Sequence, residues 1–260
     1  MSLLGLEGKV VLVTGAAAGI GAATAALFAE AGATLALCDR AEGFGDTDDP
    51  IRRTFDVRDA AATRAFVDTV AARHGRIDVV VNNAGGTFAA PFLDVSPNGE
   101  AALVAENFTQ VTTLVRAAVP YLPEGGCIVN VTSIEAHRAA PLYAVYAAKK
   151  AAQANLTQTL ALELAPRGIR VNAMAPDVLE TEGTGSMTGG GLAGDLAVSG
   201  SAYRTPPAPP LGHWGTARDG AGAIVFLASD LARFVTGVTL HVDGGNLAAG
   251  GWHRVDDARR

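Results

Sequence analysis

Ser133, Tyr146 and Lys150 combine a hydroxyl, a phenol and an ammonium group at a spacing that suits proton transfer. Ser133 follows an apolar run, Tyr146 comes thirteen residues later, and Lys150 lies four residues beyond Tyr146. The i, i+4 spacing places Tyr146 and Lys150 on one face of a helix. A phenol is a poor base at its ordinary pKa of about 10, and a nearby ammonium lowers that pKa by favouring the phenolate. Tyr146 could therefore exchange a proton with an alcohol or ketone while Ser133 holds the substrate oxygen.

A glycine-rich turn near the N-terminus, TGAAAGIG at residues 14–21, follows an apolar run and opens an alanine-rich helix. Such a turn lets the backbone approach a pyrophosphate at the positive end of a helix. We therefore expect contacts to a dinucleotide from Gly15, Ala18, Gly19, Ile20 and Gly21. The spacing is Gly-x3-Gly-x-Gly, and a glycine-rich turn taken alone is a weak signal that a plain tight turn could also give.

Asp39 lies at the end of the second predicted strand, 18 residues after Gly21. A carboxylate there can accept hydrogen bonds from the ribose of an adenosine. It would also repel a 2′-phosphate, by roughly 1–4 kcal/mol depending on the local dielectric. Residues 16–18 contain no Lys or Arg that could attract that phosphate, and the adjacent Arg40 is the one argument for NADP. The sequence thus favours NAD over NADP, although Asp39 could also be a solvated carboxylate at a strand end.

Two further polar segments follow predicted strands. In open α/β sheets, ligands bind at the carboxyl ends of the strands, so we expect cofactor contacts from both. Asp56 could hold the amino group of an adenine, whereas Asn83 could equally serve the loop backbone. The segments are Asp56-Val57 and Asn82-Asn83-Ala84-Gly85.

Short apolar runs alternate with longer helical patterns along the whole chain. Strands are predicted at 10–13, 34–38, 53–55, 77–81, 127–131, 170–174 and 239–242, and helices near 19–31, 59–74, 99–121, 143–165 and 217–228. This alternation predicts an α/β fold, with a doubly wound parallel seven-stranded sheet between two helical layers. We expect a single domain over residues 1–260.

Two stretches depart from the alternation. Residues 40–52 are short, polar and rich in turn formers, which predicts a loop or a single helical turn. Residues 182–212 are rich in Gly and Pro and too long for an ordinary connection, which predicts a substrate lid. The lid contains Met187 and Leu192, and a mostly apolar lid suits a hydrophobic or cyclic alcohol.

Composition excludes several classes of protein. The 260 residues have a formal net charge of −6 without a basic run, which argues against nucleic-acid or membrane partners. The N-terminus lacks the pattern of a signal peptide, and both cysteines lie in apolar runs, so we expect a cytoplasmic protein. No Cys/His cluster has the spacing of metal ligands, so no metal is expected.

Five motifs in order, TGAAAGIG, NNAG, Ser133, Tyr146-x3-Lys150 and FLASDLARFVTGVTLHVDGG, resemble the short-chain dehydrogenase/reductase family over nearly the whole chain. The resemblance implies a Rossmann fold, Tyr146 as acid/base, Lys150 binding the nicotinamide ribose and Ser133 orienting the substrate. It also implies that Asn107 supports a water-linked proton relay to the lysine. It further implies a homotetramer.

The resemblance places a cofactor loop after the sixth strand. Pro176, Val178 and Thr181 are expected there, with Thr181 touching the nicotinamide carboxamide. The family usually has Pro-Gly where this chain has Pro176-Asp177. Aspartate lacks the freedom of glycine at positive φ, so this loop could be rerouted.

The substrate is less well defined. Glu135 and His137 could bind a polar substituent, although both could be solvated loop residues. The expected reaction is hydride transfer between NAD(H) and a secondary alcohol or ketone, with a hydrophobic or cyclic, hydroxysteroid-like substrate. One alternative is an NADPH-dependent 3-oxoacyl thioester reductase. Another is a non-catalytic dinucleotide sensor, against which the intact catalytic set argues.

Overall fold

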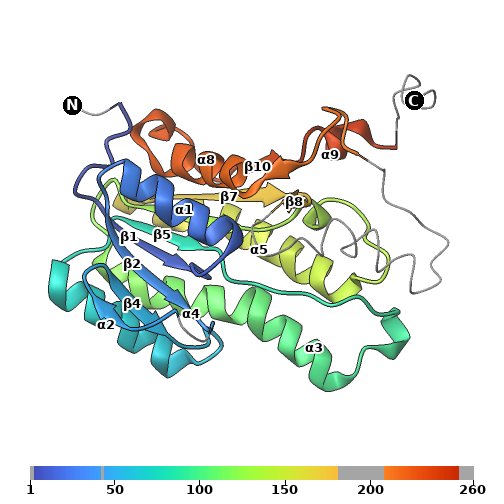
Figure 1. Cartoon of the computed structure of the whole chain (residues 1–260), viewed down its shortest axis with the longest axis horizontal. Coiled ribbons are helices and arrows are strands. Elements are labelled where there is room, and N and C mark those ends of the chain that lie inside the picture. The colour runs from blue at the N-terminus through green and yellow to red at the C-terminus, as the bar shows by residue number, and fades with distance from the viewer. Residues whose placement is uncertain (1–2, 42–43, 181–207, 252–260) are drawn as a thin grey trace.

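A twisted parallel sheet runs through the middle of the molecule (Figure 1). The computed structural model describes residues 3–41, 44–180 and 208–251. The strand order is β10-β7-β6-β5-β1-β2-β4-β3, and only β3 is antiparallel to its neighbour. The strands are β1 (Val10–Thr14), β2 (Thr34–Asp39), β3 (Thr47–Asp48), β4 (Ile51–Thr54), β5 (Val79–Asn82), β6 (Cys127–Val131), β7 (Arg170–Pro176) and β10 (Thr239–Val242). A separate parallel pair consists of β8 (Leu179–Glu180) and β9 (Gly215–Thr216).

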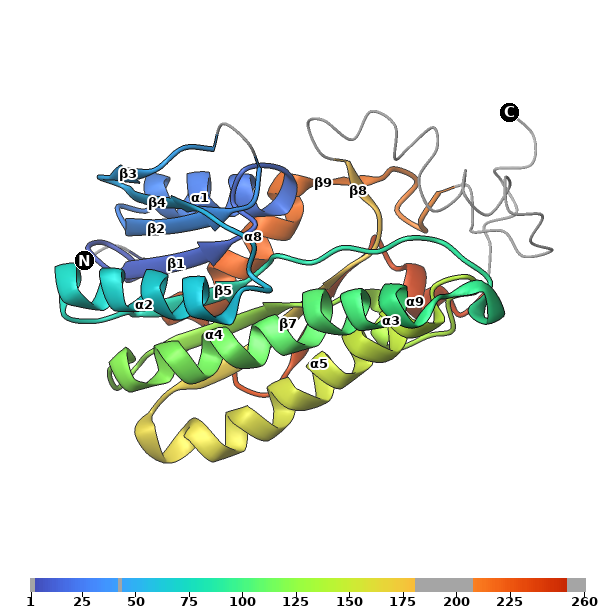
Figure 2. The same cartoon turned by 90° about the horizontal axis from the view of Figure 1, so that it is seen from below.

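Helices cover both faces of the sheet. Helices α1 (Gly19–Glu30) and α8 (Ala217–Ala228) pack on one face, and α2 (Ala60–His74), α4 (Gln110–Ala118) and α5 (Ala144–Leu164) pack on the other (Figures 1 and 2). Helix α3 (Pro97–Val104) leads into α4, and the short α9 (Asn246–Ala249) follows β10. The expected doubly wound, three-layer architecture is therefore confirmed. Within the described residues, no helix is both long enough and apolar enough to span a membrane.

Consecutive apolar residues in the strands serve two cores. Leu12 and Val80 belong to the core under α2 and α4, whereas Val11 and Val81 belong to the core under α1 and α8. Successive side chains of a strand point to opposite faces, so a strand covered on both sides is apolar at every position. All five residues of β1 are buried for this reason.

Helix ends follow local sequence signals. Asp59 caps α2 by accepting hydrogen bonds from the backbone N–H groups of Ala61 and Ala62, and Gly75 ends it at φ +73°. Thr216 and Asp219 form a reciprocal capping box at the start of α8. These contacts satisfy N–H and C=O groups that have no partner inside the helix.

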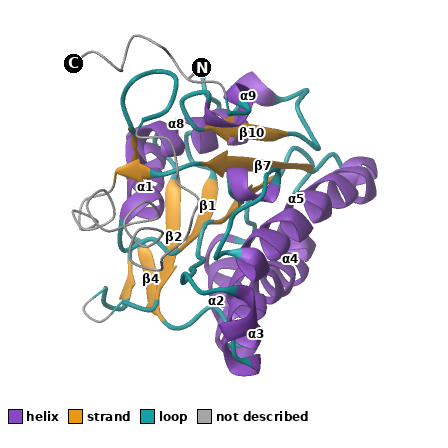
Figure 3. Cartoon of the chain, turned by 90° about the vertical axis from the view of Figure 1, so that its right-hand side faces the viewer, coloured by secondary structure: helices purple, strands orange, loops and turns teal. Residues whose placement is uncertain are grey.

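The structure corrects two expectations about elements. Residues 40–52 were expected to be a loop or a helical turn, but they include β3 and the start of β4. Strand β3 is an eighth, antiparallel strand at the edge of the sheet (Figure 2), next to β4, which pairs with β2 (Figure 3). Ile51 draws β4 into the sheet because its side chain is buried in the core. The single helix expected at 99–121 is instead divided among α3, a π-helical turn at Ala105–Thr109, α4 and a 3₁₀ turn at Val119–Tyr121.

Part of the expected lid lies outside the described residues. The lid was expected at 182–212, and the structure describes only its last five positions, 208–212. Three individual site predictions, for Thr181, Met187 and Leu192, also fall outside the described residues.

Candidate active site

The strand order changes direction between β1 and β5, which lie side by side in the sheet. The chain builds outward from β1 through β2 to β4, then returns to β5 and builds the other way to β10. In open α/β sheets a crevice forms at the carboxyl ends of the strands at such a switch point. The glycine-rich turn follows β1, and the Asn82-Asn83 segment ends β5, so both lie at this crevice.

The glycine-rich turn has a backbone that requires its glycines. Gly15 and Gly19 adopt φ of +67° and +56°. A Cβ at Gly21 would lie 1.9 Å from the carbonyl oxygen of Gly15, so α1 can pack against the turn only without a side chain there. Helix α1 begins after Ala18 with neither a side-chain cap nor an acidic residue in its first turn. Its first N–H groups are therefore available to an anion, which fits the pyrophosphate of a dinucleotide.

Thr14 and Asn83 join this turn to the end of β5. The Asn83 side-chain amide donates to the carbonyl oxygens of Thr14 and Gly15, at 2.9 and 3.0 Å. The Thr14 hydroxyl in turn accepts from the backbone N–H groups of Asn83 and Ala84. Asn83 therefore stabilises the backbone of the glycine-rich turn, which is the structural role that the sequence left open for it.

Asp39 lies directly against the turn. Its carboxylate accepts from the backbone N–H of Ala17 at 2.9 Å and from that of Ala41 at 2.8 Å. A ribose bound along the turn would meet an acceptor at this place.

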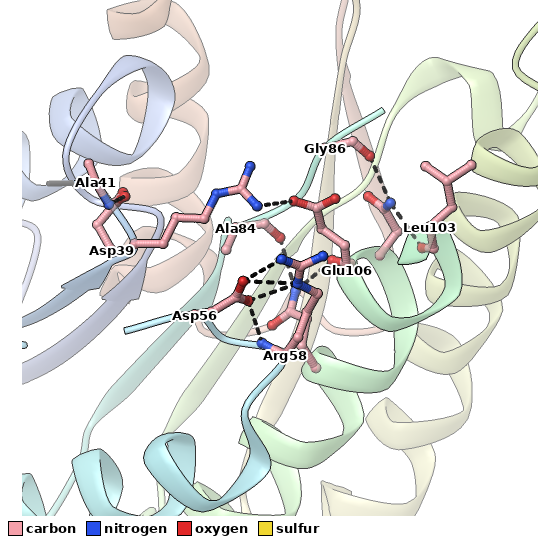
Figure 4. Close-up of polar contacts among 11 residues, drawn as sticks. Asp39, Ala41, Asp56, Arg58, Ala84, Gly86, Leu103 and Glu106 are labelled. Carbon is pink, nitrogen blue, oxygen red and sulfur yellow. Dashed lines mark hydrogen bonds and ion pairs between the residues drawn. The ribbon is translucent and has the colours of Figure 1, made fainter. Parts of the chain in front are cut away.

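Two ion pairs lie farther along the crevice (Figure 4). Arg58 donates through Nε to both carboxylate oxygens of Asp56, at 3.0 Å each, and this pairing lowers the pKa of Asp56. Arg40 pairs with Glu106 on the π-helical turn at 3.3 Å. Both candidate adenosine contacts, Asp56 and Arg40, are thus already engaged by protein partners.

The catalytic candidates converge at the ends of β6 and α5. Ser133 follows β6, and its Oγ accepts from the backbone N–H of Glu135 at 3.2 Å. Tyr146 is partly exposed in the first turn of α5 and is hydrogen-bonded to Ser133. Lys150 is buried, and its Nζ lies 5.7 Å from the centre of the Tyr146 ring. The i, i+4 spacing therefore does bring the phenol and the ammonium together.

Asn107 lies on the π-helical turn and faces the same group. Its Nδ2 donates to the carbonyl oxygens of Gly86 and Leu103, at 2.8 and 3.1 Å. Its Oδ1 is buried and has no hydrogen-bond partner in the described structure. A Cβ added at Gly85 would lie 3.0 Å from Asn107 Oδ1 and 3.3 Å from Lys150 Nζ, so the two groups border one small space. An unpartnered acceptor beside an ammonium is where a bridging water would be stabilised.

The pKa of Tyr146 differs from the sequence expectation. The ring is partly exposed, but burial of the hydroxyl raises the pKa to about 12, and the hydrogen bond with Ser133 only partly opposes that rise. Burial also lowers the pKa of Lys150 to about 8, which Glu106 counteracts. Lys150 is not among the groups that shift the pKa of Tyr146; its ammonium donates to the carbonyl oxygen of Val131 at 2.9 Å. Without a ligand the phenol is therefore protonated at neutral pH.

Glu135, one of the two predicted polar substrate contacts, is paired with an arginine of the protein itself. Arg138 donates to both of its carboxylate oxygens, at 2.8 and 3.2 Å, and lies 3.6 Å from Asp177. Asp177 also accepts from the side chain of Asn246 on α9. Its φ is not among the positive values, so the loop after β7 avoids the glycine conformation and is fixed by these contacts.

The ring of His137 packs edge-on against that of His241, with centroids 4.8 Å apart. Burial and His241 lower the pKa of His137, so its ring is neutral at neutral pH. Among the described residues, no group of three His, Cys, Asp or Glu side chains could hold a metal ion.

Glu106 and Arg138 are among the charged residues at the site that were not identified from sequence. Glu106 directly precedes Asn107 and follows the apolar run 101–105. An isolated acidic residue next to a candidate active-site residue was the feature that could have identified it. Arg138 follows Glu135 by three residues, a spacing that also occurs on ordinary surfaces. Neither pattern was specific enough to show which partner the charge would meet.

The chain is similar to known proteins over most of its length. A family model described as enoyl-(acyl carrier protein) reductase matches residues 15–246. The 3-oxoacyl-acyl-carrier-protein reductase of Thermotoga maritima is 39% identical over 253 residues, covering 92% of this chain and 98% of that protein. Cyclohexanol dehydrogenase of a Rhodococcus species is 39% identical over 271 residues, covering 93% and 97%.

Solved structures share the fold. A short-chain dehydrogenase from Burkholderia cenocepacia in complex with NADP is 32% identical and superimposes with a TM-score of 0.79, covering 93% of this chain and 98% of that one. The family model spans nearly all of the sheet and the entire catalytic group, from the glycine-rich turn to α9. The glycine-rich turn, the parallel sheet and the match over most of the chain lead to one conclusion: this chain belongs to the short-chain dehydrogenase/reductase family, a family of Rossmann-fold oxidoreductases that use a nicotinamide cofactor.

Proposed function

We propose that this protein transfers hydride between NAD(H) and a secondary alcohol or ketone, with Tyr146 as the acid/base. The observation that supports this most is the convergence of Ser133, Tyr146, Lys150 and Asn107 at the crevice beside the glycine-rich turn. A non-catalytic sensor would have no chemical need for that set of groups.

In the proposed reaction each residue has a separate task. Ser133 donates a hydrogen bond to the substrate oxygen, and Tyr146 exchanges a proton with it. Lys150 and Asn107 border a space that suits a water, through which the proton would pass toward solvent. When bound, an oxidised nicotinamide would supply the hydride acceptor and a positive charge, and that charge would favour the phenolate form of Tyr146. The raised pKa of Tyr146 in the free protein is consistent with a base that becomes competent only when the cofactor is present.

Asp39 supports NAD as the cofactor. Its carboxylate lies against the turn that would carry the pyrophosphate, where it can accept from ribose hydroxyls and would repel a 2′-phosphate. One structural relative binds NADP, so the choice has to be measured for this chain. The direct test is kcat/KM with each cofactor, and a higher value with NADP would overturn the proposal.

A hydrophobic or cyclic alcohol is proposed as the substrate. Cyclohexanol dehydrogenase, by its name, acts on a ring alcohol and is 39% identical to this chain. Glu135 cannot serve as a free polar contact, because Arg138 occupies both of its carboxylate oxygens. A panel of cyclic alcohols, hydroxysteroids, short diols and 3-hydroxyacyl thioesters, assayed with NAD, tests this. A preference for short diols would contradict it.

A second candidate is reduction of a 3-oxoacyl thioester with NADPH. The observation in its favour is the 39% identity to the Thermotoga reductase. Asp39 argues against it for the reason given above. Consumption of NADPH with acetoacetyl-coenzyme A, faster than NAD-dependent oxidation of any alcohol in the panel, would favour this alternative.

The homotetramer and the cytoplasmic location also remain proposals. Large apolar side chains are exposed at Leu162 on α5, at Phe226 on α8 and at Phe234 before β10. Exposed apolar patches often mark contacts between subunits. Light scattering in solution would measure the number of subunits directly.

A further inference from the structure

Glu106 lies between the two halves of the crevice. It belongs to the π-helical turn that also carries Asn107, and its carboxylate packs over the backbone of Gly86, where an added Cβ would lie 2.8 Å from Oε1. Its side chain is only 17% exposed. Three cations surround it. Arg40 pairs with it. Asp56, and to a smaller extent Glu106, raises the pKa of Arg58, and the charge of Glu106 partly opposes the lowering of the Lys150 pKa by burial.

Arg40 is the one basic side chain beside Asp39, at the end of β2. It is 60% exposed, so it has room to point elsewhere, yet its guanidinium pairs with Glu106 at 3.3 Å. The neighbouring Arg58 is already paired with Asp56. Each arginine at this end of the crevice therefore has a carboxylate partner within the protein.

We propose that Glu106 is a cofactor-specificity residue that holds Arg40 away from the position of a 2′-phosphate. This inference deepens the proposed preference for NAD and rests on it. Asp39 repels the phosphate directly, while Glu106 removes the guanidinium that would otherwise attract it. Exposed ion pairs are individually weak, so Glu106 tunes the choice of cofactor and Asp39 sets its direction.

The test measures binding of 2′,5′-ADP and of 5′-AMP by calorimetry, which needs neither substrate nor turnover. Glu106→Gln is expected to bind 2′,5′-ADP about fivefold more tightly, with 5′-AMP unchanged, because the released Arg40 can reach the phosphate. The double variant Glu106→Gln/Arg40→Gln is expected to lose that gain. Glu100→Gln removes the same charge from an exposed position on α3 and is expected to leave both affinities unchanged.

Arg40→Gln alone provides a second test that leaves Glu106 intact. Because Arg40 is held by Glu106, this variant is expected to bind 2′,5′-ADP as the wild type does. A severalfold loss would show that Arg40 already contacts the phosphate and would overturn the inference. A gain in Glu106→Gln that persists without Arg40 would also overturn it. If the wild type binds 2′,5′-ADP more tightly than 5′-AMP, the proposed NAD preference fails, whatever the variants show.

Discussion

The cofactor side and the catalytic side of the crevice are built from different material. On the cofactor side, around the turn at 14–21, backbone N–H groups are expected to bind the ligand, and the glycines leave room for a ligand to approach them. On the catalytic side, at the end of β6 and the start of α5, the reactive groups are the side chains of Tyr146 and Lys150, whose pKa values depend on burial. The first kind of site is sensitive to added atoms, and the second is sensitive to lost charges and hydrogen bonds.

The largest effect is expected on the catalytic side, from Tyr146→Phe. The ring stays in place while the exchangeable proton is lost, so kcat should fall by roughly 10²–10⁴-fold. NAD affinity should stay close to that of the wild type, because the substitution does not change the glycine-rich turn. Steady-state kinetics and calorimetry measure the two effects, and residual activity above about a tenth of wild type would exclude Tyr146 as the acid/base.

Lys150→Met tests how much the burial of the ammonium group lowers the stability of the folded protein. The pKa of Lys150 is lowered to about 8 in the folded protein from 10.5. The unfolded chain therefore binds more protons between these values, and wild-type stability rises with pH across that window. The stability of Lys150→Met relative to wild type should be highest below pH 8 and fall by about 3 kcal/mol as the pH passes through the window.

Denaturant unfolding from pH 7 to pH 10.5 measures this difference. Lys149→Met makes the same change at a partly exposed neighbour and serves as the control. A constant difference between Lys150→Met and wild type across the window would mean that the ammonium is not penalised by burial.

Gly21→Ala tests the cofactor side. The added Cβ would lie 1.9 Å from the carbonyl oxygen of Gly15, so α1 and the turn must separate. Overpacking of this kind costs about 1–3 kcal/mol, and NAD affinity should fall together with stability. Gly222→Ala is the matched control, because its Cβ would meet nothing within 4 Å on the exposed side of α8. That control should be neutral or slightly stabilising, and equal losses in both variants would contradict a special role for Gly21.

Asp39→Ser is expected to give the smallest of these effects, and it changes which cofactor is preferred. Removing the carboxylate removes repulsion of a 2′-phosphate, so the ratio of kcat/KM for NAD to that for NADP should fall, by about tenfold. Combining it with Glu106→Gln should lower the ratio further, because Arg40 is then free. An unchanged ratio in Asp39→Ser would mean that Asp39 does not meet the ribose.

The sequence alone determined the architecture and the identity of most groups at the site. Strands apolar at every position predicted a sheet covered on both faces, and the pleat explains why Val11 and Leu12 serve different cores. Glycine at residues 15, 19 and 21 and the Tyr146–Lys150 spacing are local features, so they could be recognised without knowing the fold.

Only the tertiary structure decided how charges meet across the crevice. Arg40 and Glu106 are 66 residues apart in the sequence, and Asp177 and Asn246 are 69 apart. Nothing in the sequence indicates these partners, because side-chain pairing across a sheet edge depends on where distant elements end. The same holds for the raised pKa of Tyr146, since burial depends on every element packed around the ring. Short sequence motifs determine local backbone geometry, whereas ion pairs and pKa values depend on the assembled site.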